Sequence, residues 1–538
     1  MLQKIKGMPI KEMTDHMKLK HLLFLLVVYT GLFFFLFPYY RYVIDADATG
    51  YMYVAEQVAR GNWSDAVNGL WSPLGSWVLA PFIKSGFDPV LTVKYLNGFY
   101  GLVILCSFFS LVKKLRLLIA TATGILLAAV LLILHFVFLR LFGDLMQAMF
   151  LLLYLNVVCS IGFYKDHKKI LLAAFIGGLG FYAKAYNFYF VLVHLSIVLL
   201  LMGKKQTGIL FNAEALKKIL TAATTLILAV LPWAFVLKYK YGSFMLSRTG
   251  AYNMTWSLSQ VYDQPRVLFY PPPNTEGYSI WDDPSYWNVT DVTPFTNSKT
   301  FIFQLKLIGS NLIDLLKDLN AYSLLLIPVL IICVLMLFKT RGPFSGNIIN
   351  SILTWFIIIW PLGILLLHVE ARFLWIMAMT GLLLGAVLLE YFFRLKHLKK
   401  SLWVLSVIIF TGSFCIYPVQ KLVRQAGLGK DIYEMADVFK KNGIGGKMIS
   451  FHQDSDERSS CVILNYLLKG KYFGPHEKKY TDAEILAGIE KYKIDNYILF
   501  YHSTEQKDEI LNGVIASKAG KVYGDLYPGV IVLGFEHK

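Results

Sequence analysis

Long apolar runs dominate the first four-fifths of the chain. Eleven of them alternate with short polar stretches, at about residues 20–40, 92–111, 117–139, 145–163, 169–182, 187–202, 219–237, 321–338, 348–367, 372–391 and 402–418. A transmembrane helix needs about 20 mostly apolar residues, with a range of about 17–25. The fifth and sixth runs are short, so we expect tilted, broken or enclosed helices there. The pattern predicts a polytopic α-helical membrane protein with about eleven transmembrane helices.

The pattern changes in the last part of the chain. Residues 420–538 mix acidic and basic positions with short β-rich runs, at Lys447–Phe451, Asn496–Phe500 and Val530–Phe535. Helical stretches at Asp431–Lys441 and Asp482–Lys491 fall between these runs. A segment of this length suits one hydrophobic core. We therefore predict two domains, a membrane module of residues 1–419 and a small α/β domain of residues 420–538.

Composition agrees with this division. The chain is 56% hydrophobic and only 16% charged, whereas soluble domains have about 25% charged residues. The net charge of +17 is concentrated in short loops between apolar runs, which argues against a nucleic-acid partner. The five cysteines show neither a CxxC pair nor a Cys/His spacing, so we expect no disulfide framework and no zinc site. The first apolar run is too long for a cleavable signal.

Basic loops predict the orientation of the chain. The N-terminal tail is basic, and every second loop is basic as well, as in Lys113-Lys114-Leu115-Arg116, Lys165–Lys169 and Lys204-Lys205. Positive loops stay on the cytoplasmic side. We expect a multi-pass protein of the cytoplasmic (inner) membrane with its N-terminus in the cytoplasm. The loops 41–90 and 238–320 and the C-terminal domain then lie outside the cytoplasm.

The first outer loop contains acids directly after the first apolar run. Asp45 and Asp47 precede apolar positions at helical spacing, which favour a short helix lying on the membrane. The stretch W-S-P-L-G-S-W-V-L-A-P-F predicts a second interfacial or re-entrant helix. A carboxylate here can act as a general base. Alternatively, Asp47 or Thr49 caps the helix that follows, and both roles are compatible.

Four later ionisable residues lie at the same predicted side. Asp144 begins the fourth apolar run, where it either complements the helix dipole or shares acid–base or cation-binding work with Asp47. Lys184 falls in a break between two short runs, either snorkelling or holding an anionic head group. Glu370 and Arg372 form a local pair or face a cavity together, and Arg suits phosphate.

One acidic pair in the second outer loop has two explanations. Asp282-Asp283 lies in the stretch S-I-W-D-D-P-S. Two adjacent carboxylates can bind a metal ion, but a turn before Pro284 is the more common role.

These motifs, in this order, resemble a known family. The first-loop stretch D-A-D-A-T-G-Y, W-S-P-L-G-S-W, G-D-L-M, A-K-A-Y, the Y-G-S-F…S-I-W-D-D-P-S loop and V-E-A-R-F extend through most of the chain before Gln420. Together they resemble GT-C-fold glycosyltransferases, above all the bacterial relatives of protein O-mannosyltransferases and of the lipid A aminoarabinose transferase. Such enzymes move a sugar from a polyprenyl-phosphate carrier to an acceptor on the outer face of the membrane.

The resemblance implies a role for each acid and base. Asp47 matches the general base because it keeps the spacing to Gly50-Tyr51, and Asp144 matches the second acid, which assists catalysis or binds a divalent cation with Asp47. Lys184 and Arg372 match the groups near the donor phosphate. Supporting positions are Asp45, Tyr51 and Glu370.

The resemblance leaves the substrates open. Ala48 follows Asp47, so the first loop lacks the Asp-Glu dipeptide of the protein mannosyltransferases. The sugar is therefore unassigned, and the acceptor is a glycan, a lipid or a protein. An attacking acceptor opposite the leaving phosphate implies inversion at the sugar.

Three other functions remain open from the sequence. A secondary transporter would show repeated halves and acids near the middle of the bilayer, whereas these acids gather at one edge and no repeat is visible. A lipid-linked glycan polymerase or ligase would use the same class of donor and rely on arginines in a large outer loop. A sensor would depend on the C-terminal domain. Removing the chain from Gln420 onward would abolish sensing but leave a transferase partial activity.

Overall fold

The structure is a computed structural model that describes residues 17–258, 261, 267–285, 292–338, 347–396, 399–451, 455–475 and 480–537. The contacts divide the chain into two compact units. The membrane unit comprises Met1–Tyr40, Val93–Ser247 and Pro294–Ala426. The second unit, here the α/β unit, comprises Arg41–Thr92, Arg248–Thr293 and Gly427–Lys538. Two segments that the sequence assigned to the membrane module thus pack with the C-terminal residues.

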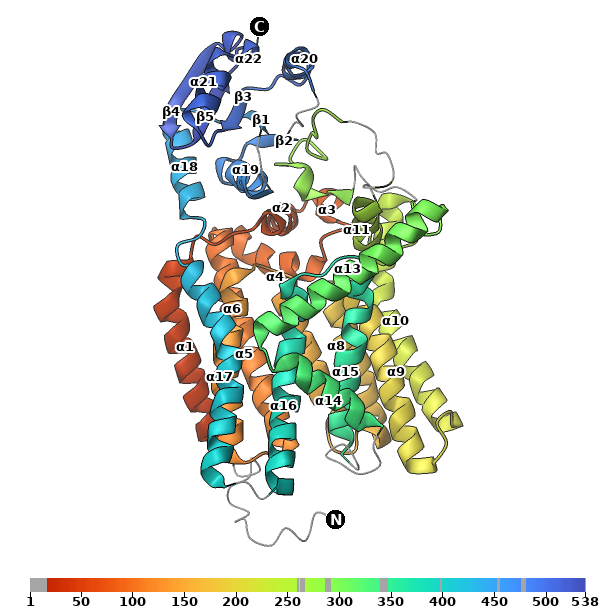
Figure 1. Cartoon of the computed structure of the whole chain (residues 1–538). Helices are drawn as coiled ribbons and strands as arrows, with labels where there is room; N and C mark the ends of the chain where they lie inside the picture. Colours follow the sequence, from red (N-terminus) through yellow and green to blue (C-terminus); the bar gives the residue numbers. More distant parts are fainter. Residues whose placement is uncertain are drawn as a thin grey trace. The chain divides into compact units, whose positions relative to one another are not determined.

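The described elements of the membrane unit are helices, and Figure 1 shows the long ones side by side with roughly parallel axes. Its elements are α1 (Leu19–Tyr40), α5 (Pro89–Leu115), α6 (Ile119–Leu139), α7 (Asp144–Val158), η3 (Phe163–Lys165), α8 (His167–Ala183), α9 (Tyr186–Thr207), α10 (Ala213–Tyr241), α13 (Ser298–Tyr322), α14 (Leu326–Leu337), α15 (Ile348–Leu365), η5 (Ala371–Leu374), α16 (Trp375–Lys396) and α17 (Lys400–Arg424).

Each of the eleven apolar runs forms a helix. Within the described residues, eight helices are long and apolar enough to cross a membrane, and a ninth span results if α13 and α14, bent by 110°, count as one. The two remaining runs, the fourth and the fifth, form the short helices α7, of 15 residues, and α8, of 17 residues. The prediction of a short helix is wrong for the sixth run, which forms α9, of 22 residues. The protein is therefore an integral membrane protein, as the hydrophobic pattern predicts.

Glycines allow α8 to sit at the centre of a helix cluster. This helix packs against α7, α9 and α10. A Cβ added at Gly177 would lie 2.6 Å from Val191 of α9, and one at Gly178 would lie 2.5 Å from Ala229 of α10. Small residues let helix backbones approach closely in membranes, where van der Waals contact is a main driving force. The G-G-L-G stretch of this short helix is thus explained by packing.

One long helix was not expected. Residues 238–320 were predicted only as an outer loop, but α13 occupies its last part and crosses the membrane unit obliquely (Figure 1). Asn297 caps its start by accepting a hydrogen bond from Thr300 N at 2.9 Å. Gln304 and Asn311 donate to the carbonyls of Leu366 and Leu365, at 2.8 and 2.9 Å. These bonds satisfy carbonyls that the end of α15 leaves unpaired.

The α/β unit contains a sheet of five described strands in the order β2-β1-β3-β5-β4. β1 is parallel to β2 and β3, β5 is antiparallel to β3, and β4 forms an antiparallel hairpin with β5. The strands are β1 (Lys447–Phe451), β2 (Lys471–Pro475), β3 (Asn496–Phe500), β4 (Lys521–Tyr527) and β5 (Val530–Gly534). The three strands predicted from the sequence are present. β2 and β4 were missed because each is interrupted by glycine.

Helices of this unit come from all three of its chain segments. They are α2 (Ala46–Arg60), α3 (Trp63–Ala66), α4 (Pro73–Lys84), α11 (Thr249–Leu258), η4 (Ile280–Asp282), α18 (Lys430–Lys441), α19 (Ser455–Leu468), α20 (Asp482–Tyr492), α21 (Thr504–Asn512) and α22 (Val514–Ser517). α2 packs against α4, α19 and η4. The two short helices predicted in the first outer loop are thus present as α2 and α4.

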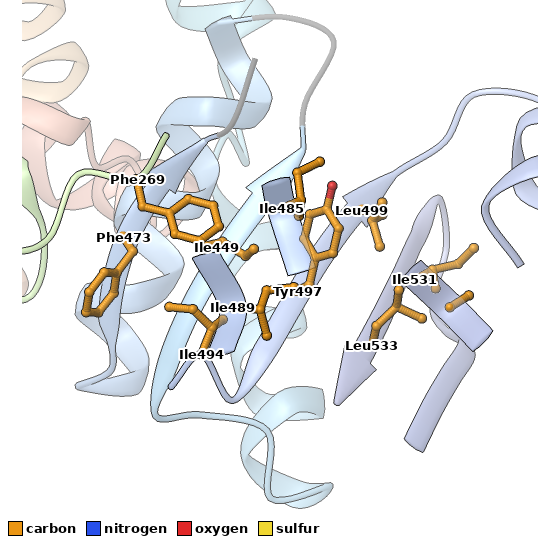
Figure 2. Close-up of a cluster of buried hydrophobic side chains, with 11 residues drawn as sticks. Phe269, Ile449, Phe473, Ile485, Ile489, Ile494, Tyr497, Leu499, Ile531 and Leu533 are labelled. Carbon is orange, nitrogen blue, oxygen red and sulfur yellow. The ribbon is translucent and has the colours of Figure 1, made fainter. Parts of the chain in front are cut away.

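Phe269 joins the hydrophobic core of the sheet from a distant part of the sequence. Its side chain is 1% exposed and packs among Ile449, Ile485, Ile489 and Tyr497 (Figure 2). Gly488 of α20 makes room for it, because a Cβ there would lie 2.6 Å from the Phe269 ring. The segment before η4 is therefore part of the core of the α/β unit.

The same segment covers the edge of the sheet. Tyr270 N donates to Phe473 O at 2.6 Å, and Tyr472 N donates to Tyr278 O at 2.6 Å. Ser279 also forms a parallel bridge with Tyr472. β2 is an edge strand, and an uncovered edge presents unpaired backbone groups to other chains. Residues 270–279 thus satisfy this edge and fix the start of η4.

Candidate active site

The first outer acid caps helix α2. Asp45 has an extended backbone, and its Oδ1 accepts a hydrogen bond from Ala48 N at 2.8 Å. The sequence predicted Asp47 or Thr49 as the cap, and this prediction is wrong. The Thr49 hydroxyl donates to Ala46 O instead. Gly61 ends the helix in the left-handed conformation, at φ 80°, which glycine adopts without steric cost.

Asp47 lies in the first turn of α2, and its carboxylate does not cap the helix because Asp45 does so. Trp281 Nε1 donates to Asp47 Oδ1 at 3.2 Å. The guanidinium of Arg458, at the start of α19, lies 5.9 Å from the Trp281 ring centroid. Burial, with a smaller contribution from the charge of Asp47, raises the pKa of Tyr252 to about 12. The predicted base is thus held by a tryptophan within an aromatic and cationic surrounding.

A glycine in α2 makes this arrangement possible. Trp71 Nε1 donates to Trp281 O at 2.9 Å, and a Cβ at Gly50 would lie 2.3 Å from that nitrogen and 2.8 Å from that carbonyl oxygen. Because Gly50 has no Cβ, the hydrogen bond from Trp71 to the Trp281 carbonyl can pass directly over this face of the helix. Tyr51, the next residue, is buried, and its ring centroid lies 5.1 Å from that of Trp71.

Glu56 is a buried acid that the sequence analysis missed. It is 5% exposed, and its carboxylate accepts hydrogen bonds from Tyr278 at 2.6 Å, from Tyr466 at 2.8 Å and from Lys469 at 2.8 Å. These partners come from the second outer loop and from α19. The signal in the sequence was a lone acid within an otherwise apolar helical face. Glu56 therefore ties three chain segments of the α/β unit together.

Asp282 forms a turn, which was the more common of its two predicted roles. Its Oδ2 accepts from Tyr278 N at 2.5 Å and from Ser279 N at 3.0 Å, as part of a capping box at η4. Its Oδ1 is buried without a hydrogen-bond partner among the described residues. Burial raises the pKa of Asp282 to about 8. The adjacent Asp283 accepts from Ser285 Oγ at 2.7 Å.

In the membrane unit, a strained turn presents Asp144. Phe142 has φ 62° and Gly143 has φ 35°, and α7 begins at the next residue. A left-handed conformation is uncommon for a bulky residue, and such strain concentrates at functional sites. The turn is supported by Asn97, whose Nδ2 donates to Arg140 O at 2.9 Å. Asp144 is 7% exposed at the first position of the helix.

Two cations meet the Asp144 carboxylate. Lys184 forms an ion pair with Asp144 Oδ1, and Arg372 NH1 lies 3.6 Å from Asp144 Oδ2. Lys184 follows the last residue of α8 with an extended backbone, so it occupies the break before α9 that the short apolar runs predict. Its ammonium also lies 4.5 Å from the Phe373 ring centroid. A buried carboxylate is tolerated here because it is paired twice.

Glu370 completes this cluster. Arg372 NH2 donates to Glu370 Oε1 at 3.1 Å, and His368 Nε2 lies 3.1 Å from the same oxygen. Burial alone would raise the pKa of Glu370, but the hydrogen bond with His368 and the charge of Arg372 outweigh it and hold the pKa well below its usual range. The local Glu–Arg pair is therefore formed, in a turn rather than a helix, and Arg372 extends it to Asp144.

Buried side chains hold this turn. Tyr322 OH donates to Ala371 O at 2.9 Å, and Trp360 Nε1 donates to Phe373 O at 2.7 Å. One helical turn beyond Asp144, Gln147 donates to Asn187 Oδ1 at 3.0 Å, which joins α7 to α9. The cluster of Asp144, Lys184, Glu370 and Arg372 thus rests on neutral polar contacts from four helices.

The donor set at Asp144 fits a divalent cation poorly. Its carboxylate is already balanced by two cationic side chains, so a metal ion would have to displace one of them. Among the described residues, no group of three or more His, Cys, Asp and Glu side chains gathers as metal ligands do. A cation held with Asp47 stays a prediction.

The predicted site residues thus fall into two sets. Asp144, Lys184, Glu370 and Arg372 form one charged cluster in the membrane unit. Asp47 and Tyr51 lie in helix α2 of the α/β unit, and Asp45 caps the start of this helix. Trp281 and Glu56 are additional residues of the second set.

These features define a class of protein, an integral membrane protein with a GT-C-like fold. Its structure is similar to the Archaeoglobus fulgidus oligosaccharyltransferase in complex with Zn and sulfate, with a TM-score of 0.53 and 11% identity over 85% of this chain. The chain spans 64% of the length of that oligosaccharyltransferase. It is also similar to apo ArnT from Cupriavidus metallidurans, with a TM-score of 0.52 and 10% identity, over 94% of this chain and 97% of that chain.

Both solved structures are GT-C-fold glycosyltransferases. At this identity the likeness is one of fold. No protein-family model matches the chain, and no curated protein matches it.

Proposed function

We propose that this protein is a membrane glycosyltransferase that moves a sugar from a polyprenyl-phosphate donor to an acceptor at the outer face of the cytoplasmic membrane. The observation that carries the proposal is the cluster of Asp144, Lys184 and Arg372 at helix ends of a GT-C-like fold. A lipid-phosphate donor has its tail in the bilayer and its reactive bond at the water boundary, where these helix ends would meet it.

Lys184 and Arg372 suit the donor phosphate. Lys184 has one acceptor, Asp144, within the described part of the chain, so two of its three N–H groups remain for phosphate oxygens. Arg372 presents a planar fork that matches phosphate. Glu370 and Asp144 hold these cations in place before the donor arrives. Preorganised charge of this kind stabilises the negative charge that develops on a leaving phosphate.

Asp47 would act as the general base. In this step the acceptor O–H gives its proton to the Asp47 carboxylate, and the acceptor oxygen forms a bond to the sugar C1. The bond from C1 to the phosphate oxygen breaks, and its electron pair leaves on the polyprenyl phosphate. A single displacement inverts the configuration at C1. Trp281 orients the carboxylate, and Asp45 and Tyr51 support the helix that presents it.

The test is a donor screen with purified protein, radiolabelled polyprenyl-phosphate sugars and membrane extracts as acceptors. We expect one donor to be consumed with inversion, and Asp47→Asn to lower the rate by about 10²–10⁴-fold, the range for a lost general base. Asp65→Asn, which removes an acid from the same outer segment, is the matched control and should keep the wild-type rate. Retention of configuration, or near-normal turnover by Asp47→Asn, would contradict the proposal.

Cation dependence can be read in the same assay. We expect transfer to survive EDTA because the charge of Asp144 is already balanced. Loss of activity that a divalent cation restores would show that Asp47 and Asp144 bind a metal after all.

A further inference from the structure

A cavity of about 730 Å³ that is broadly open to the surface lies in the membrane unit among α1, α5, α7 and α8. This volume is within the range of about 300–1,000 Å³ that small-molecule sites occupy. α7 runs away from Asp144 and α8 runs toward Lys184, and the cavity is lined by residues 153–160 and 169–172 of this part of the chain. It is therefore at the opposite end of these helices from the charged cluster, and it is a separate site.

The walls of the cavity form a long stripe that is mostly apolar by area and apolar in sequence at one end. On α5 the lining residues run from Phe99 through Leu102 and Cys106 to Lys114, along one face of the helix. At 1.5 Å per residue this stripe is about 22 Å long. Its part from Phe99 to Cys106 is apolar over about 10 Å, and Ser107, Ser110 and Lys114 follow toward the other end. Leu26 of α1 and Leu153 of α7 add to the walls. These dimensions suit a single extended acyl chain.

One end of the cavity is cationic. Lys114 and Lys169 both line it. Lys114 Nζ donates to Asn156 O at 2.7 Å and to Asn156 Oδ1 at 2.9 Å, which leaves its third N–H without an acceptor among the described residues. Lys169 Nζ donates to Ile161 O at 2.6 Å, with Asp166 at 3.9 Å as an exposed, partial counter-charge.

Two further observations indicate an anionic occupant at this end. The Ser160 hydroxyl lines the cavity and is buried without a hydrogen-bond partner in the described structure. None of the described residues that line the cavity is acidic. A donor left unpaired near two ammonium groups fits an acceptor-rich group such as a phosphate.

We propose that this cavity binds one anionic phospholipid, with an acyl chain along α5 and the phosphate head group at Lys114, Lys169 and Ser160. The apolar length selects a lipid over a soluble phosphate, and the two lysines without a lining acid select an anionic over a zwitterionic head group. The occupant would brace the ends of α7 and α8, whose other ends carry Asp144 and Lys184. This binding does not depend on the proposed transferase function.

The test is native mass spectrometry of the full-length protein in detergent, titrated with phosphatidylglycerol or phosphatidylcholine. We expect one phosphatidylglycerol to bind at least tenfold more tightly than phosphatidylcholine and to raise the Tm. The double variant Lys114→Gln/Lys169→Gln should lose that preference. The matched control Lys165→Gln/Lys168→Gln removes two exposed lysines nearby that do not line the cavity, and it should bind as the wild type does.

A third variant tests the acyl chain separately. Cys106→Trp fills the cavity wall and leaves both lysines in place, so it should lower phosphatidylglycerol binding at least tenfold. Thermal melting of each variant without lipid shows whether it folds. If the double variant unfolds, the single Lys169→Gln variant replaces it, because this variant keeps the Lys114–Asn156 contact. Equal binding of the two lipids by the wild type, or equal loss in both double variants, would overturn the proposal.

Discussion

Lys184 is held by an ion pair with Asp144 and by contact with the Phe373 ring, and in the proposed function it binds the donor phosphate. We predict that Lys184→Gln lowers the rate of sugar transfer by about 10²–10³-fold, the loss that follows removal of one preorganised donor, while the protein still inserts and melts like the wild type. The measurement is single-turnover transfer with saturating donor.

Lys238 supplies a matched control for this variant. Its ammonium lies 4.5 Å from the Phe244 ring centroid, just as that of Lys184 lies 4.5 Å from the Phe373 ring centroid. Among the described residues it makes no ion pair with a carboxylate, so Lys238→Gln should transfer normally. Equal losses in the two variants would mean that cation–aromatic packing, and not the phosphate, accounts for the role of Lys184.

Asp282 gives the α/β unit a pH dependence whose sign can be worked out. Its folded-state pKa of about 8 exceeds its ordinary value of 3.8. Between these values the folded state keeps a proton that the unfolded state has lost, so stability falls as the pH rises through this window. We predict that Asp282→Asn removes this fall. At pH 8.5 the free energy of unfolding of the variant should exceed that of the wild type by at least about 1.4 kcal/mol, the equivalent of one pKa unit.

Thermal melting at pH 5 and pH 8.5 measures this difference. Asp283→Asn, at the adjacent position, is the control and should keep the wild-type pH dependence. Parallel melting curves for the wild type and Asp282→Asn at both pH values would contradict the prediction.

At the scale of residues, the sequence located the acids but not their partners. The sequence identified both Asp45 and Asp47 as candidate site residues. Which of them caps the helix depends on the extended backbone conformation of Asp45, which the sequence does not reveal. Trp281, which bonds Asp47, is 234 residues away, and no local spacing reports such a contact. Glu56 was passed over because a single acid in an apolar helical face resembles an exposed one until its partners from α19 are known.

At the scale of elements, Gly50 determines whether α2 can present Asp47. An alanine in a helix interior usually gains about 0.5–1 kcal/mol over glycine, but here its Cβ would collide with Trp71 and with the Trp281 carbonyl. We predict that Gly50→Ala destabilises the α/β unit, shifts its tryptophan fluorescence and lowers transfer at least tenfold.

Gly31 offers the comparison, because nothing lies within 4 Å of a Cβ added there in α1. Gly31→Ala should melt at or above the wild-type temperature and transfer normally. A neutral effect of Gly50→Ala on both fluorescence and transfer would show that the tryptophan bond does not position Asp47.

Helices that cross the membrane were the most predictable elements, because nothing else produces runs of such length and apolarity. α13 escaped prediction for the opposite reason. Its lysines, serines and asparagines interrupt the apolar pattern. The side-chain amides of Gln304 and Asn311 donate hydrogen bonds to carbonyls at the end of α15. β2 was also missed, because glycine interrupts K-Y-F-G-P and because one of its two edges pairs with residues of the distant second outer loop.

At the scale of the whole molecule, the C-terminal residues complete a unit that begins near residue 41. We predict that a chain ending at Ala426 loses transfer altogether, although the sequence alone led us to expect partial activity from a transferase. The truncated chain would lack β2, which pairs with residues 270–279, and it would lack Tyr466 and Lys469, which satisfy Glu56.

Limited proteolysis within residues 267–285 would report this loss independently of activity. Phe269→Ala in the full chain is the graded comparison, because removing a buried phenylalanine costs about 3–5 kcal/mol. It should increase cleavage without abolishing transfer. A truncated chain that keeps more than a tenth of the wild-type rate would show that the membrane unit and the outer segments suffice.

The division of the α/β unit into three chain segments has a consequence for biosynthesis. The ribosome makes Phe269 and the partners of β2 long before it makes β2, β3 and β5. At about 5–20 residues per second, roughly ten to fifty seconds pass between these events. During that time Glu56 and Phe269 are outside any finished core, so this unit cannot fold as it emerges. Its sheet and the core around Phe269 therefore form only near the end of translation.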